Sequence, residues 1–349
     1  MHLNYKMKNG SNEISNNNNP NNIKLLCEIT KSSYGCFDLD NTFAVFKTFN
    51  NLLYLVYSTK YKSLICYDLD KFQIINETKN HHKKYITNIR HFQDKINRKD
   101  LVISISDRDN NLRLWNVNNW ECIVNIQNIN NNGYICTACI INDNNQNYIL
   151  STNFNLLEVF NVSEPIKIFN FKGEKIKEIN DSDKKTFFID AFYDNDKSTN
   201  YIITGNLHYV KSYNYDKNEK YQQYFDSDTG CHISIIIYNN QGVIKLIESC
   251  SDGNIRIWNF HSAELLDKIK VDDDWLFGIC LWNNDHLFVG CKDKIIRLVE
   301  LKEGLIVKYL EGHNSGIFTI KKIKHPKYGD CLISQGYEGD QIRLWITQN

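Results

Sequence analysis

Three stretches of the chain end in the same way, and their spacing limits the folds that the chain can adopt. The segments NNLRLWNV, GNIRIWNF and DQIRLWIT alternate apolar and polar residues and reach a tryptophan at Trp115, Trp258 and Trp345. Weaker copies of the segment end at Tyr67, Phe160, Tyr213 and Val299. Successive copies are about 41 to 53 residues apart. A unit repeated at this interval predicts an array of equivalent small sheets.

The residues between these positions read as strands. In the second unit, the apolar runs YITNIRHF, DLVISIS, NLRLWNV and ECIVNIQ are separated by Asn, Asp and Gly. This pattern predicts four short strands for each unit. The third unit is interpreted as YICTACII, NYILSTN, NLLEVFNV and IKIFNF. No stretch has a convincing helical period, so the fold class is all-β.

The composition narrows the class of protein. Lys+Arg and Asp+Glu are balanced at 41 each, so we expect no direct nucleic-acid binding. There is no long apolar run and no signal-peptide core, which predicts an intracellular protein, cytoplasmic or nuclear, without membrane insertion. The eleven cysteines show no disulfide framework. Cys136 and Cys139 form a CxxC in a strand-like run, where they point to opposite faces, so shared metal ligation is not expected.

Several repeat units carry further common residues. The run EGH at residues 311–313 and the stretches SDGNIRIWN and SDRDNNLRLWN resemble the WD40 (WD-repeat) family. The resemblance covers nearly all of the chain after residue 21, as seven repeats, and identifies no specific member. The chain departs from the family pattern at Asn116, Asn259 and Ile346, where the family has the Asp of its Trp-Asp pair. The resemblance implies a seven-bladed β-propeller of four-stranded antiparallel blades.

The family resemblance also implies a buried Asp–His–Ser/Thr–Trp hydrogen-bond network with a structural role. Its predicted members in this chain are His82, Asp109, Trp115, Asp252, Trp258, Asp293, His313 and Trp345. An arginine recurs two residues before the repeat position, and we expect the four copies to form an exposed row. These are Arg113, Arg256, Arg297 and Arg343.

The two ends of the chain predict how the ring closes. The last repeat has three strands, and its final strand, residues 341–347, lacks an outer partner. Residues 22–30, NIKLLCEIT, read as a strand with no blade of its own. Since exposed strand edges are usually paired or covered, we expect residues 22–30 to complete the seventh blade. Residues 1–21 are polar and Asn-rich and predict a disordered tail, which leaves 22–349 as a single propeller domain.

The sequence offers little for catalysis. It contains no GxSxG, HExxH, Walker A or dinucleotide motif, so we expect no enzyme activity, no cofactor and no metal. The residue before each inner strand is expected near the channel mouth. The charged run 172–185 is expected to be a mobile surface loop and is a second candidate for partner contact. The candidate partner-binding rim consists of Tyr85, Tyr134, His232, Asp272, Asp273, Asp274 and Trp275.

Exposed aromatic rings beside carboxylates suit a basic or aromatic anchor residue. The alternative for the rim is that the aromatic rings pack on neighbouring loops and the aspartates are simply solvated. The predicted function is a non-catalytic interaction scaffold that binds proteins or peptides within a larger complex. An alternative is a reader of basic or modified peptides at the channel mouth, and a third is a hydrolytic propeller.

Overall fold

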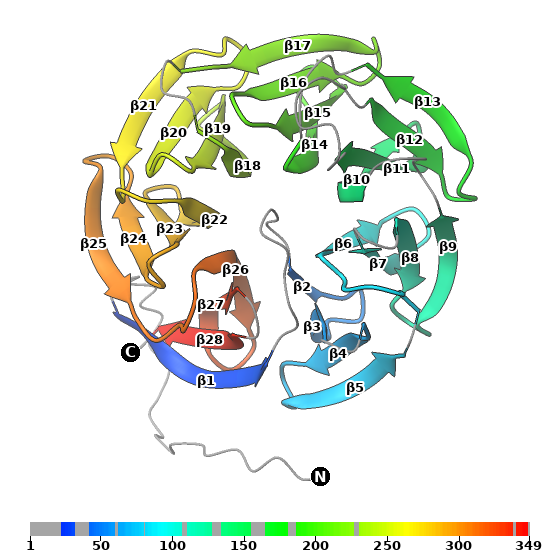
Figure 1. Cartoon of the computed structure of the whole chain (residues 1–349), viewed down its shortest axis with the longest axis horizontal. Helices are drawn as coiled ribbons and strands as arrows, with labels where there is room; N and C mark the ends of the chain where they lie inside the picture. Colours follow the sequence, from blue (N-terminus) through cyan, green and yellow to red (C-terminus); the bar gives the residue numbers. More distant parts are fainter. Residues whose placement is uncertain are drawn as a thin grey trace.

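The computed structural model describes residues 22–31, 42–59, 62–79, 81–106, 110–127, 134–154, 165–180, 186–226, 230–337 and 340–347. Within these ranges the chain forms seven four-stranded antiparallel sheets, which surround a common axis as the blades of a propeller (Figure 1). The predicted fold class is therefore confirmed. Among the described residues, no helix is long and apolar enough to span a membrane. The predicted tail, residues 1–21, lies outside them.

The first four blades each run from the axis outward in chain order. Blade 1 consists of β2 (Phe43–Lys47), β3 (Leu53–Ser58), β4 (Leu64–Asp68) and β5 (Gln73–Thr78). Blade 2 consists of β6 (Asn88–Asp94), β7 (Lys99–Ser106), β8 (Asn111–Asn116) and β9 (Glu121–Gln127). Blade 3 consists of β10 (Tyr134–Asp143), β11 (Gln146–Phe154), β12 (Ile166–Asn170) and β13 (Lys175–Ile179). Blade 4 consists of β14 (Phe188–Asp194), β15 (Thr199–Gly205), β16 (Val210–Asn214) and β17 (Glu219–Tyr224).

The remaining blades follow the same plan, except that the outer strand of blade 7 comes from the start of the chain. Blade 5 consists of β18 (His232–Asn240), β19 (Val243–Cys250), β20 (Asn254–Asn259) and β21 (Leu265–Lys270). Blade 6 consists of β22 (Leu276–Asn283), β23 (His286–Cys291), β24 (Ile296–Glu300) and β25 (Leu305–Leu310). Blade 7 consists of β26 (Ile317–His325), β27 (Gly329–Gly336), β28 (Gln341–Thr347) and β1 (Ile23–Lys31).

The predicted closure of the ring is confirmed. Strand β1 pairs antiparallel with β28, in a register that joins Ile23 to Thr347 and Lys31 to Gln341. Side chains also join the two strands, because the Arg343 guanidinium lies 2.9 Å from the Glu28 carboxylate. Ile23 and Ile29 are buried in the clusters on either side of blade 7. Backbone pairing and apolar burial therefore both hold the first strand in the last blade.

Blade 3 differs from its predicted strands. The run NLLEVFNV with Phe160, predicted as its third strand, lies outside the described residues. The third strand is β12, which was predicted as the fourth, and Phe169 takes the place of the repeat tryptophan. The fourth strand is β13, inside the run 172–185, so the prediction of a surface loop for the whole run is wrong. A charged segment can form this strand because an outer strand needs few apolar contacts, and here Ile179 is buried.

The turns explain how a chain with three prolines forms so many hairpins. Asparagine tolerates positive φ better than most residues, and a two-residue hairpin turn of type I′ requires positive φ at both central positions. Asn144 and Asn145, with φ of 47° and 61°, join β10 to β11 in this way. The asparagine content therefore contributes directly to the sharp returns between neighbouring strands.

Candidate partner-binding surface

The loops on one face of the ring are held by a buried hydrogen-bond network in blade 7. The indole Nε1 of Trp345 donates to Ser334 Oγ over 2.7 Å, and this hydroxyl is 2.6 Å from Nε2 of His313. The other ring nitrogen of His313 lies 2.8 Å from the carboxylate of Asp340. The network thus connects the third strand to the loop that leads into the first strand. Sequence reasoning missed Asp340, which lies one residue closer to its tryptophan than Asp252 and Asp293 lie to their repeat positions.

Electrostatics favour an ionised Asp340. Burial alone would raise its pKa, but hydrogen bonds from His313 and from the backbone amide of Gln341, together with the charge of Arg343, hold the pKa well below its usual range. Burial and the same arginine lower the pKa of His313. The carboxylate therefore carries the negative charge that the buried arginine requires.

Blade 2 repeats the connection. Trp115 Nε1 donates to Ser104 Oγ over 2.8 Å, and Ser104 Oγ lies 2.8 Å from Nε2 of His82. Asp109, the predicted acidic member, lies outside the described residues. A buried Trp–Ser–His connection in two blades of a closed ring of seven four-stranded blades matches the family's pattern of residues. The chain is a seven-bladed β-propeller whose repeats resemble those of the WD-repeat family.

In blade 5 a glutamate, Glu248, stands at the position that the network serine has in blades 2 and 7. Glu248 pairs across the sheet with Arg256, as Ser334 does with Arg343, so it occupies the serine position. Its carboxylate accepts a hydrogen bond from Trp258 Nε1 at 3.0 Å and lies 2.7 Å from Nδ1 of His232. Glu248 and His232 are 0% and 2% exposed. His232 therefore belongs to the interior, and we exclude it from the candidate surface.

The charge of Glu248 governs the state of His232. Burial would lower the pKa of the imidazole, but the nearby carboxylate attracts the proton and accepts a hydrogen bond, and the net effect is a raised pKa. In blade 5, Glu248 thus links the tryptophan to His232, which belongs to the first strand itself. In blades 2 and 7, a serine links the tryptophan to a histidine from the preceding loop.

The recurring arginines are buried or nearly so, and Arg256, Arg297 and Arg343 form ion pairs, so the prediction of an exposed row is wrong. Arg113, Arg256 and Arg343 are 8%, 0% and 3% exposed. The side chain of Arg256 lies 2.5 Å from Asp252 and 3.0 Å from Asp226. The third strand is sandwiched within its sheet, and carboxylates from the adjoining turns neutralise the guanidinium groups. Asp252 thus binds an arginine and is not seen to contact a histidine.

Blade 6 holds the same kind of pair. Arg297 lies 2.6 Å from Asp293 and 2.7 Å from Asp272. Asp272, Cys291 and Asp293 place three potential metal-ligand atoms within 4.8 Å of one another. However, the guanidinium lies against both carboxylates, and burial raises the pKa of the Cys291 thiol to about 12. The group is therefore better suited to hold an arginine than a metal ion.

Aromatic rings gather on the same face above blades 6 and 7. The ring of Trp275 lies 6.2 Å from that of Phe277, which stacks on Phe318 at 4.2 Å. Phe318 in turn lies 5.3 Å from Tyr337. The two phenylalanines are buried, whereas Trp275 and Tyr337 are partly exposed. Sequence reasoning found only the tryptophan, although Phe277 and Phe318 both stand second in the inner strands of neighbouring blades.

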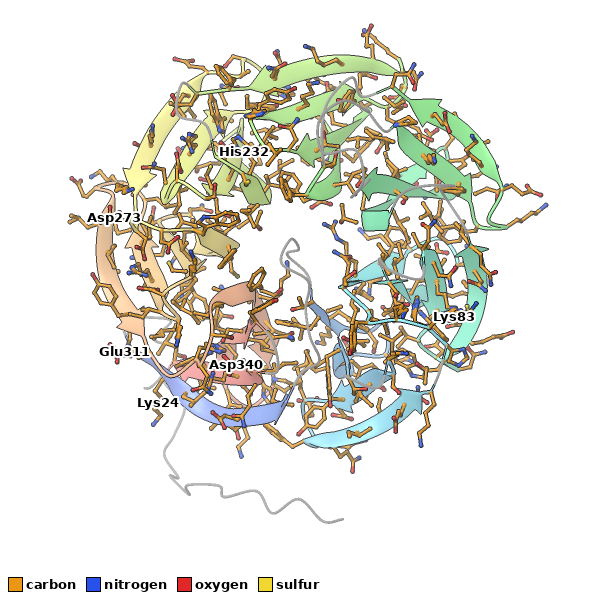
Figure 2. All side chains as sticks on the ribbon, in the orientation of Figure 1. Lys24, Lys83, His232, Asp273, Glu311 and Asp340 are labelled. Atoms are coloured by element: carbon orange, nitrogen blue, oxygen red, sulfur yellow. The ribbon has the colours of Figure 1, made fainter. Side chains whose placement is uncertain are left out.

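The three aspartates that precede Trp275 differ in how exposed their side chains are. Asp272 is turned inward to Arg297, while the side chain of Asp273 is fully exposed and that of Asp274 is 48% exposed. Asp274 lies 3.1 Å from the ammonium of Lys292. Figure 2 places Asp273 toward the outer margin of the ring, on the loop from β21 to β22. We call Asp273, Asp274, Trp275 and Tyr337 the top-face patch.

Two other predicted rim residues, Tyr85 and Tyr134, belong to blades 2 and 3 and lie outside this patch. Tyr85 is 37% exposed before the first strand of blade 2, and Tyr134 is the first residue of β10. Thr186, the corresponding residue of blade 4, is buried. In blade 7, Gly316 lies where an added Cβ would come within 3.2 Å of Phe277 and the Lys292 backbone, so the loops are closely packed there. The patch is a strip across blades 6 and 7.

The comparisons with known proteins are sparse. No protein-family model matches the chain. Over 137 residues it is 26% identical to the U3 small nucleolar RNA-associated protein 21 homolog of Schizosaccharomyces pombe. The similar stretch covers 39% of this chain and 15% of that protein. Divergence of the repeats, such as Val299 and Phe169 at tryptophan positions, agrees with the weak similarity.

Proposed function

We propose that this WD-repeat propeller is a non-catalytic scaffold that holds a partner protein within a larger complex. The observation that carries the proposal is the top-face patch, where the partly exposed Trp275 stands beside the fully exposed carboxylate of Asp273. Large aromatic side chains in such settings are typical anchors of protein interfaces. Phe277 and Phe318 hold the patch from below, so little side-chain freedom would be lost on binding.

The chemistry of the patch favours a basic side chain as the anchor of the partner. A guanidinium or ammonium group can lie over the indole face and at the same time approach the exposed aspartates. This makes a reader of basic peptides the second candidate function. The two candidates differ in the partner, since a scaffold holds a folded protein in a stable complex and a reader binds a short segment reversibly.

The Schizosaccharomyces pombe relative is described as associated with U3 small nucleolar RNA. We therefore propose RNA–protein assemblies as the first class of complex in which to look for this chain. The balanced charge of the chain favours contact through the protein components of such an assembly.

The test is affinity purification of the full chain from its native cells, with identification of the bound proteins. The variant Trp275→Ala combined with Asp273→Asn should reduce recovery of the main partner by about tenfold or more. A matched control combines Tyr193→Ala with Asp267→Asn, since both residues are exposed away from the patch. Equal recovery with both double variants would reject the patch as the contact. Saturable binding of short basic peptides, without a stable protein partner, would favour the reader.

A further inference from the structure

The inner strands enclose a cavity of about 300 Å³ at the axis of the ring, where β2, β6, β14, β18 and β26 face one another (Figure 1). Its volume is at the lower end of those that hold small molecules in proteins. Its wall combines apolar and charged side chains, among them Phe43, Phe188, Ile235, Arg90, Asp190 and Lys321. None of these six residues belongs to the top-face patch.

The ion pair in this cavity leaves hydrogen-bond donors unused. Arg90 Nη1 lies 3.4 Å from Asp190 Oδ1, which is long for a charge-assisted hydrogen bond. The same oxygen accepts a hydrogen bond from the backbone amide of Ala191 at 2.9 Å. Arg90 Nε is buried, and no hydrogen-bond partner for it is found in the part of the chain that the structure describes. Because an unpaired buried donor is costly, a second acceptor close to this guanidinium would be stabilising.

The described residues of the cavity wall carry more positive than negative charge. No hydrogen-bond or ion-pair partner is found for the Lys321 ammonium among the described residues. Among the described wall residues, two cations thus face one carboxylate, that of Asp190. His91, also in the wall, lies 3.0 Å from Asp100 and stacks on Phe46, and burial lowers its pKa, so it adds no positive charge.

We propose that this cavity binds a small organic anion, with a carboxylate or phosphate group between Arg90 and Lys321. Phe43, Phe188 and Ile235 supply apolar wall for the rest of the molecule. The guanidinium suits a ligand group with two or more oxygens, since it can donate more than one hydrogen bond in a fixed plane. This proposal is independent of the scaffold function, because it uses the inner strands and leaves the top-face patch free.

Calorimetric titration of the full chain with phenyl phosphate and with benzoate tests the proposal. We expect saturable binding of one molecule for each chain with at least one of these anions, and none with the neutral benzamide. Lys321→Met should weaken binding about tenfold, because it removes a charged donor. Asp190→Asn should tighten it about threefold, because it removes the competing negative charge. Lys324→Met, an exposed lysine on the same strand, should leave affinity unchanged.

The opposite effects of the two charge changes separate a ligand site from general damage to the fold, since damage would weaken binding in both variants. Melting of Lys321→Met should match the unsubstituted chain, because this ammonium has no hydrogen-bond or ion-pair partner among the described residues. A titration with a tetraglutamate peptide separates a free small molecule from an inserted acidic side chain. The proposal is overturned if neither small anion binds at millimolar concentration, if only the peptide binds, or if Lys321→Met binds as tightly as the unsubstituted chain.

Discussion

Glu248→Ala is the substitution that most directly tests the network in blade 5. It removes the acceptor that lies 3.0 Å from Trp258 Nε1 and 2.7 Å from His232 Nδ1. Both remaining groups are 2% exposed, so water cannot replace the carboxylate without opening the blade. Loss of one member of a buried ion pair costs about 3–5 kcal/mol, and we expect about 4 kcal/mol for this variant. In urea unfolding followed by tryptophan fluorescence, the midpoint should fall by about 1–2 M.

The control is Glu264→Ala, which removes an exposed carboxylate from the same blade and should change stability by less than about 0.5 kcal/mol. The raised pKa of His232 adds a pH test. Its stabilising contribution is complete below its ordinary pKa of 6.5 and is lost as pH rises through the raised value. The difference between the unsubstituted chain and Glu248→Ala should therefore be smaller at about pH 9 than at about pH 6. A loss no larger than that of Glu264→Ala, or one independent of pH, would refute the charged buried pair.

Two further predictions concern blade 7. Deletion of residues 1–21 should leave the melting temperature unchanged. Deletion of residues 1–31 should lower it, because β28 would lose its outer partner strand, β1. Equal melting temperatures for the two truncated chains would contradict this closure. With Asp340→Asn, the free energy of unfolding should fall less steeply as the pH is lowered from about 5 to 3, as measured by urea unfolding. The lowered pKa of Asp340 stabilises the fold above the ordinary value of 3.8, and this contribution is lost as pH falls below it, so parallel acid profiles would count against the role of the carboxylate.

Sequence patterns predicted the repeated strands and the closure of the ring, because the alternation of apolar and polar residues marks each strand locally. The tryptophans at the ends of third strands indicated equivalent sheets, and the unpaired last strand required a partner from elsewhere in the chain. Blade 3 could not be predicted in the same way. It offers more apolar runs than strand positions, and alternation alone does not choose among them. The choice depends on cross-strand register, such as the pairing of Tyr148 with Asn170.

The buried charges escaped prediction for a different reason. The alternation of residues puts Arg256 and Arg343 on a polar face, but each is buried against one carboxylate from the adjoining turn and a second from a distant segment. Glu28, for example, is 315 positions from the arginine that it pairs with. His232 looked like a rim residue because its partner, Glu248, replaces the expected serine and has no motif of its own. Local sequence thus predicted the strands well and the contacts between them poorly.

The pairing of β1 with β28 also sets an order of events during synthesis. Among the strands of the ring, β1 is translated before all others and its neighbour β28 after all others, so β1 lacks this partner while six blades are translated. Contacts between such distant segments form slowly, and strands that wait for a partner are open to aggregation. A nascent chain therefore gains its seventh blade only after synthesis reaches β28, and chaperone protection of β1 would matter most during this interval.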